Sequence, residues 1–161
     1  MTMIKKTRQE IIEFGRNLIN FFSDVRNTKF SHFLQRNIKV TQNVEAELVK
    51  ISVVSKEFMT FENERIALCE RFSQKDENLK PVIKDGQYVF GDRKAAFDKE
   101  FAKLKFANQT VISIQQAKQK EVQELLKEEI EVGFLSIEAD ALPGNLSIQQ
   151  LEILDPLIIG G

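Results

Sequence analysis

The positions of glycine and proline constrain this chain most. The sequence holds seven glycines and three prolines in 161 residues, and neither type occurs between Gly15 and Pro81 or between Gly91 and Gly133. Glycine and proline are the residues that most strongly interrupt regular helix. The two uninterrupted stretches therefore predict long helices joined by a short, turn-rich region, and a fold that is mainly α.

Residues on the predicted apolar face of the first stretch recur at steps of three and four, as they do along Val44, Leu48, Ile51, Ser55 and Phe58. This spacing places them on one face of a helix, which we expect to run from about residue 41 to 73. At 1.5 Å per residue such a helix is roughly 50 Å long. That length predicts a coiled-coil-like arm, because a compact neighbour cannot cover it.

The second stretch carries apolar residues at multiples of seven: Phe97, Leu104, Val111 and Leu125. A seven-residue repeat is the spacing with which one long helix packs against another. We therefore expect helix over about residues 92–127. Together the two stretches predict a long antiparallel helical hairpin over residues 30–127.

The turn-rich region between the two stretches predicts a small β-hairpin over residues 81–91 at the tip of the helical hairpin. Two β-prone runs flank Asp85-Gly86, and Asp-Gly is a strong signal for a tight hairpin turn. We expect the apolar and aromatic side chains of the tip, Val82, Tyr88 and Phe90, to bind a protein partner.

The two ends of the chain show other patterns, within what we take to be a single domain over residues 1–161. Residues 1–28 predict an N-terminal helix with Ile11, Leu18 and Phe22 on its apolar face. Residues 128–161 begin with alternating apolar and polar residues, which predict a strand. A short helix then starts at Ser147 and ends near Pro156.

Charge is distributed unevenly along the chain. Residues 1–40 carry a net charge of +5, with eight basic and three acidic residues. Residues 128–161 hold seven acidic residues and no basic ones. Opposite charges of this size can bring the two ends together, within one chain or between chains, and a solvated surface is the alternative.

The sequence lacks the motifs of several classes of enzyme and ligand-binding site. It has no glycine-rich phosphate loop, dinucleotide fingerprint or H-E-x-x-H motif. The single histidine, His32, and the single cysteine, Cys69, are 37 positions apart, and we interpret Cys69 as a core residue. We expect no enzymatic activity, no cofactor, no metal and, because no apolar run approaches 18 residues, no membrane span.

Basic residues near the N-terminus suggest one kind of ligand site. We consider Arg16, Arg26, Arg36 and Lys39 as anion-binding residues, able to hold the phosphates of a nucleotide. The formal net charge of −1 and the lack of a reading motif argue against nucleic acid as the partner.

The segment from Lys75 to Leu104, KDENLKPVIKDGQYVFGDRKAAFDKEFAKL, resembles a family of small proteins from tailed bacteriophages and prophages. The family pattern joins K-D-E-N-x-x-P-V to A-F-x-K-E-F, with an acidic β-prone segment and a short helical close after it. Those pieces occur here in the same order over roughly residues 35–158. The chain departs from the family in residues 105–120 and at its N-terminus. The resemblance implies a phage origin and transfers no functional residues.

Phenylalanine use points to binding rather than to catalysis. The chain has 13 Phe, one Tyr and no Trp, and a two-helix arm cannot bury that many aromatic rings by itself. We therefore expect a homo-oligomer or a phage or host protein partner, in the host cytoplasm or the virion. The leading hypothesis is a non-enzymatic interaction protein, as a virion or tail-assembly component. The alternative is an anti-defence protein that inhibits a host immune protein or sequesters a nucleotide signal.

Overall fold

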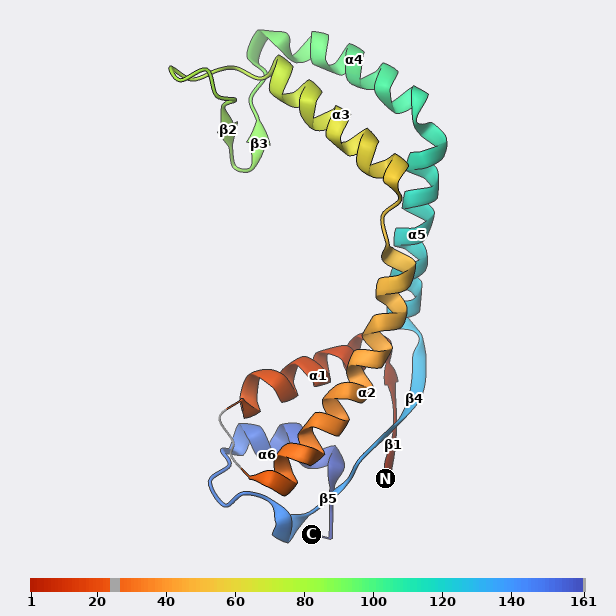
Figure 1. Ribbon diagram of the computed structural model, residues 1–161, viewed down its shortest axis with the longest axis vertical. Coiled ribbons are helices and arrows are strands. Elements are labelled where there is room, and N and C mark those ends of the chain that lie inside the picture. The colour runs from red at the N-terminus through yellow and green to blue at the C-terminus, as the bar shows by residue number, and fades with distance from the viewer. Residues whose placement is uncertain (24–26, 161) are drawn as a thin grey trace. The chain divides into compact units, whose positions relative to one another are not determined.

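The computed structural model describes residues 1–23 and 27–160, and it is mainly helical with small sheets of two strands each (Figure 1). The chain divides into two compact units, and the single domain expected over residues 1–161 stays a prediction. Unit 1 comprises Met1–Ser52 and Lys120–Gly161, and unit 2 comprises Val53–Gln119. Each unit has its own set of packed side chains and is described separately.

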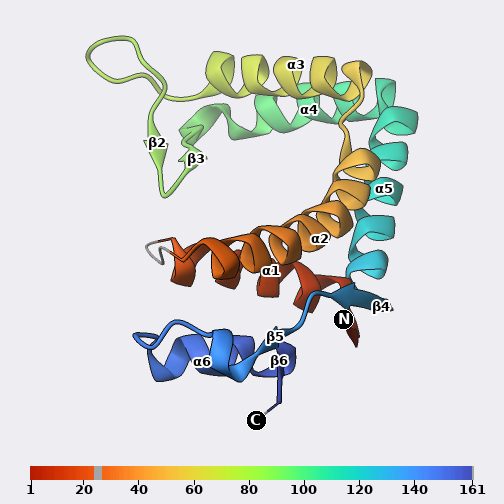
Figure 2. The ribbon, with the colours of Figure 1, turned by 60° about the horizontal axis from the view of Figure 1, so that its bottom comes forward.

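Unit 1 is built from helices and two small sheets of two strands each. In chain order its main elements are β1 (Thr2–Thr7), α1 (Arg8–Phe22), α2 (Thr28–Ser52), the end of α5 (Gln109–Lys127), β4 (Glu129–Phe134), β5 (Ile137–Glu138), α6 (Ile148–Leu154) and β6 (Ile158–Ile159). Helices α1 and α2 lie side by side, and α6 lies against α1 (Figure 2). Strand β5 pairs in parallel with β6.

The first residues of the chain form a strand, so the prediction of helix over residues 1–28 is wrong for residues 2–7. Strand β1 pairs antiparallel with β4, with Ile4 opposite Val132. The pairing joins the basic N-terminal segment to the acidic C-terminal one, and the Lys5 ammonium lies 3.0 Å from the Glu129 carboxylate. The two oppositely charged ends therefore meet within one chain, through the β1–β4 pairing, and the predicted strand after residue 128 is confirmed.

The switch from β1 to α1 follows from a local capping box. The Thr7 hydroxyl accepts a hydrogen bond from the Glu10 backbone N–H, and the Glu10 carboxylate accepts one from the Thr7 backbone N–H at 2.9 Å. This reciprocal pair satisfies donors that a helix start leaves free. Helix α1 then buries Ile11, Ile12 and Leu18 in the core of unit 1.

The crossing of α1 and α2 depends on one glycine. A Cβ atom added at Gly15 would lie 2.0 Å from the Thr41 hydroxyl oxygen, and Thr41 is itself buried. The two helix backbones approach this closely because position 15 has no side chain. Phe22, Phe30 and Phe33 continue the same core, with neighbouring ring centroids 5.7 Å apart.

The C-terminal segment closes unit 1. Ser147 begins α6, as predicted, and forms a capping box with Gln150. Two residues of this segment, Leu154 and Leu157, are fully buried in the core of unit 1. A single turn of 3-10 helix over Asp155–Leu157, with Pro156 in it, ends the helix.

Unit 2 holds α3 (Lys56–Phe72), β2 (Ile83–Lys84), β3 (Gln87–Tyr88), α4 (Lys94–Ala107) and the start of α5. The continuous helix expected over residues 41–73 is therefore wrong, because α2 ends at Ser52 and α3 begins at Lys56. The Ser55 side chain accepts a hydrogen bond from the Phe58 N–H at 3.1 Å, and so caps a new helix start. The second predicted helix is also interrupted, at Asn108 between α4 and α5.

Helix α3 packs against α4, with the β2–β3 turn region between them in the sequence (Figure 1). The predicted Asp85-Gly86 turn is confirmed, since β2 and β3 pair antiparallel and both turn residues have positive φ. Aromatic rings fill the contact: Phe97 stacks on Phe90 at 4.1 Å and on Phe101 at 5.5 Å. Phe72 lies edge-on to Phe97 from α3.

No helix in the described part of the chain is both long enough and apolar enough to cross a bilayer.

Candidate functional site

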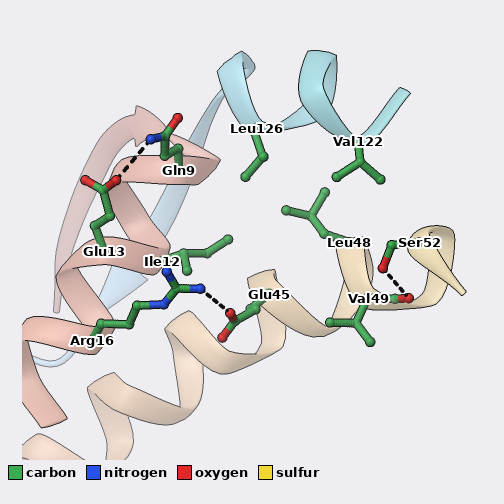
Figure 3. A pocket seen from close by; sticks show the side chains of 10 residues that line it. All are labelled: Gln9, Ile12, Glu13, Arg16, Glu45, Leu48, Val49, Ser52, Val122 and Leu126. Atoms are coloured by element: carbon green, nitrogen blue, oxygen red, sulfur yellow. Dashed lines mark hydrogen bonds and ion pairs between the residues drawn. The ribbon is translucent and has the colours of Figure 1, made fainter. Parts of the chain in front are cut away.

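Two hollows on the surface of unit 1 contain residues that the sequence predicted to bind an anion, and α2 contributes to both. The first, which we name the α1–α2 groove, lies between α1, α2 and the end of α5 and encloses about 330 Å³ (Figure 3). Its apolar floor is formed by Ile12, Leu48, Val122 and Leu126.

The polar rim of the α1–α2 groove is already paired. The Arg16 guanidinium donates to the Glu45 carboxylate at 2.8 Å, and the Gln9 amide donates to Glu13 at 3.0 Å (Figure 3). Arg16, one of the predicted anion-binding residues, therefore has its charge balanced by a carboxylate in the same groove. This arrangement favours an apolar occupant over an anionic one.

The second hollow, which we name the α2 basic pocket, gathers two other predicted anion-binding residues. Arg36 and Lys39 line it together with His32, and it encloses about 470 Å³. Its complete lining consists of Met1, His32, Arg36, Asn37, Lys39, Val40, Asn43, Gly133 and Leu135. Arg26, the fourth predicted residue, lies outside the described residues. The structure thus brings Arg36 and Lys39 together and places Arg16 elsewhere in unit 1.

Asn37 holds one wall of the α2 basic pocket in place. Its side chain is 0 % exposed and makes two hydrogen bonds to the backbone of a single residue. The amide nitrogen donates to the Leu135 carbonyl at 3.0 Å, and the Leu135 N–H donates to the amide oxygen at 2.7 Å. This pair fixes the chain just after β4 against α2, which no sequence motif indicated.

The predicted partner-binding residues of the tip differ in how free their side chains are. Val82, Tyr88 and Phe90 are all half-buried. The Phe90 ring stacks on Phe97, so it contributes to the internal packing of unit 2. In the same region the large apolar side chains most open to solvent are Leu79, which is 81 % exposed, and Ile83, which is 55 % exposed. Sequence reasoning passed over both, although each is a large apolar residue in a turn-rich segment. Partner binding by the tip stays a prediction.

Unit 2 also has an open groove on the α3–α4 pair, which we name the α3–α4 groove. It encloses about 500 Å³ and is lined by Glu64, Ala67, Leu68, Arg71, Glu100, Lys103 and Leu104. Charges of both signs surround its small apolar centre. The Lys103 ammonium lies 2.8 Å from Glu100 and lowers the pKa of that carboxyl.

The two residues considered for catalysis, Cys69 and His32, lie in different units of the chain. Cys69 is buried in unit 2, and burial raises the pKa of its thiol. A buried thiol with a raised pKa is a poor nucleophile. His32 is exposed on α2 in unit 1. Among the described residues, no three His, Cys, Asp or Glu side chains are grouped so as to hold a metal ion.

Comparison of the chain with models of protein families, with curated protein sequences and with solved structures gave no match.

Proposed function

We propose that this chain is a non-enzymatic protein-binding protein and that unit 2 is its docking element. The observation that carries the proposal is how little apolar surface unit 2 buries by itself. Across residues 53–119, all of which are described, the buried apolar side chains are Phe61, Cys69 and Phe97. Eight large apolar side chains of the same unit are exposed: Val53, Val54, Met59, Ile66, Leu79, Ile83, Phe106 and Ile114.

The excess of exposed over buried apolar side chains matters because apolar surface that stays in water does not stabilise the fold of unit 2. Phe106 alone, which is 75 % exposed, forgoes about 1.5–3 kcal/mol that full burial of such a side chain provides. Exposed apolar surface marks a protein–protein contact where it is contiguous, and the small number of buried apolar side chains in unit 2 supports such a contact here. In this proposal α3 and α4 act as a short antiparallel helical pair, which is a part of the helical hairpin expected over residues 30–127.

The α3–α4 groove favours a second copy of the chain as the occupant. Glu64 and Arg71 are seven residues apart on α3, so they share a face, with Ala67 between them. Two α3 helices related by a two-fold axis beside Ala67 place Glu64 opposite Arg71 of the partner subunit, and the same pair recurs across the axis. The small Ala67 side chain permits a close approach there.

Charge reversal tests this arrangement directly. Glu64→Arg or Arg71→Glu alone turns two attractions into two repulsions, and we expect the dimer to weaken by about tenfold or more at low ionic strength. An equimolar mixture of the two variants restores both attractions in a heterodimer. Glu121→Arg, an equal change of charge on the exposed surface of α5, is the matched control.

Sedimentation velocity over a range of concentrations measures these outcomes. The proposal predicts self-association of the unmodified chain, loss with either single reversal, and recovery in the mixture. A chain that stays monomeric at every concentration contradicts the second copy as occupant. Equal association of all variants contradicts the α3–α4 groove as the contact.

We further propose a phage role, which rests on the resemblance of Lys75 to Leu104 to phage and prophage proteins. The role can take two forms, and one experiment distinguishes them: mass spectrometry of gradient-purified virions beside lysate of infected cells. Stoichiometric presence in the virion supports a virion or tail-assembly component. Abundance in the lysate with absence from virions supports a host-directed inhibitor in the host cytoplasm.

A further inference from the structure

The α2 basic pocket in unit 1 has a composition that protein binding by unit 2 does not explain. His32, Arg36, Lys39 and Asn43 follow one another at steps of four, three and four along α2. This spacing puts all four on one face of the helix, over three turns. The pocket therefore presents a continuous row of groups that donate hydrogen bonds.

No carboxylate lines the α2 basic pocket, although acidic residues are common in the chain. Like charges three residues apart on a helix repel each other, and here the pocket contains nothing to balance Arg36 and Lys39. The α1–α2 groove offers the contrast, because there Arg16 is paired with Glu45 at 2.8 Å. A basic pocket without an acidic neighbour favours an anion from outside the chain.

The floor of the pocket is firm and partly apolar. The two hydrogen bonds between Asn37 and Leu135 hold the wall after β4, and Val40 lies beside them in the lining. At Gly133 an added Cβ would lie 3.3 Å from the sulfur of the exposed Met3 side chain, so apolar methionine side chains border this side of the pocket. An apolar or aromatic group can therefore rest on the floor while an anionic group reaches Arg36 and Lys39.

We propose that the α2 basic pocket binds a small phosphorylated molecule. The Arg36 guanidinium pairs with two phosphate oxygens through its planar fork, and Lys39 adds a point charge. The non-phosphate part of the ligand lies over Val40 and Leu135. The volume of about 470 Å³ falls within the range of small-molecule sites.

The test uses the full chain, with adenosine monophosphate, inorganic phosphate and adenosine as probes in isothermal titration calorimetry. We expect the monophosphate to bind more tightly than inorganic phosphate, and adenosine to bind least. Arg36→Gln and Lys39→Gln each lower the affinity for the monophosphate by about tenfold or more. Arg16→Gln, the same change in the α1–α2 groove, leaves that affinity unchanged.

Three results overturn the proposal. The first is no heat of binding with either phosphate probe at millimolar concentration. The second is an affinity that Arg36→Gln and Lys39→Gln leave unchanged while circular dichroism shows both variants folded. The third is a single-stranded oligonucleotide that binds more tightly than the monophosphate and loses that binding in the same variants, since it assigns the pocket to nucleic acid. None of these results bears on self-association through unit 2.

Discussion

Replacing Asn37 by alanine removes the two hydrogen bonds that join α2 to the chain after β4. In the folded protein the Asn37 side chain is fully buried, and both its polar atoms are used by the Leu135 backbone at 3.0 and 2.7 Å. Alanine leaves the Leu135 N–H and carbonyl without these partners. We therefore expect Asn37→Ala to destabilise unit 1 and to loosen one wall of the α2 basic pocket.

The size of the effect follows from three contributions. Two hydrogen bonds contribute about 1 kcal/mol each, and a buried group left unpaired costs about 1–3 kcal/mol. Leu135 is 39 % exposed and its two hydrogen bonds with Asn37 are only partly buried, so the lower end of that range applies. Alanine is the better helix former by roughly 0.5 kcal/mol, which offsets a little of the loss. The net expectation is a destabilisation of about 2–3 kcal/mol.

Urea denaturation followed by circular dichroism measures the loss as a fall in the unfolding midpoint. Asn43→Ala is the matched control, because Asn43 is an exposed residue of the same helix and its replacement gains the same helix propensity. We expect the control to be as stable as the unmodified chain, or slightly more stable. Equal midpoints for Asn37→Ala and Asn43→Ala would refute the role assigned to Asn37.

Three further predictions concern single residues. Gly15→Ala places a Cβ 2.0 Å from the Thr41 hydroxyl oxygen, and we expect it to lower the free energy of unfolding in urea by about 1–3 kcal/mol. Gly144→Ala, where nothing lies within 4 Å of the added Cβ, is the control and should be neutral. Equal effects of the two substitutions contradict the close helix crossing. Hydrogen bonds from the Thr7 backbone and side chain lower the pKa of the Glu10 carboxyl, so its contribution to stability is present above its unfolded pKa and is lost as pH falls through the folded value. Glu10→Gln should therefore lose less stability than the unmodified chain between about pH 5 and pH 3, and parallel acid-unfolding curves argue against the capping box. Burial raises the pKa of the Cys69 thiol, so a disulfide reagent should modify it slowly in the native chain and quickly in urea; equal rates contradict its burial.

Local signals in the sequence predicted part of the fold well. The Asp85-Gly86 turn, the strand after residue 128 and the helix start at Ser147 each depend on a few neighbouring residues. Such features need no knowledge of distant packing.

The errors arose where distant contacts or single caps decide the outcome. Residues 2–7 form a strand because β4 pairs with them, and that partner lies more than a hundred residues away. The long helix divides at residues 53–55, which contain neither glycine nor proline. There the Ser55 side chain starts a new helix, a signal that a search for breakers passes over.

The candidate site was predictable in its residue types and not in its grouping. Arg36 and Lys39 share a pocket because they are three residues apart on one helix, and that spacing can be read from the sequence. Arg16 looked equivalent to them but lies beside Glu45, a residue of another helix. The wall held by Asn37 depends on a contact between residues 98 positions apart, and no local pattern reveals it.

Disulfide cross-linking of a single introduced cysteine tests the central claim, docking of two copies through the α3–α4 groove, most directly. In a Cys69→Ser background, Ala67→Cys places a thiol beside the two-fold axis, where its copy comes close enough for a disulfide. Gln116→Cys, on the exposed surface of α5, is the control. The account predicts a covalent dimer for Ala67→Cys under mild oxidation and little for the control. A monomer for Ala67→Cys, or equal dimer from both variants, contradicts it.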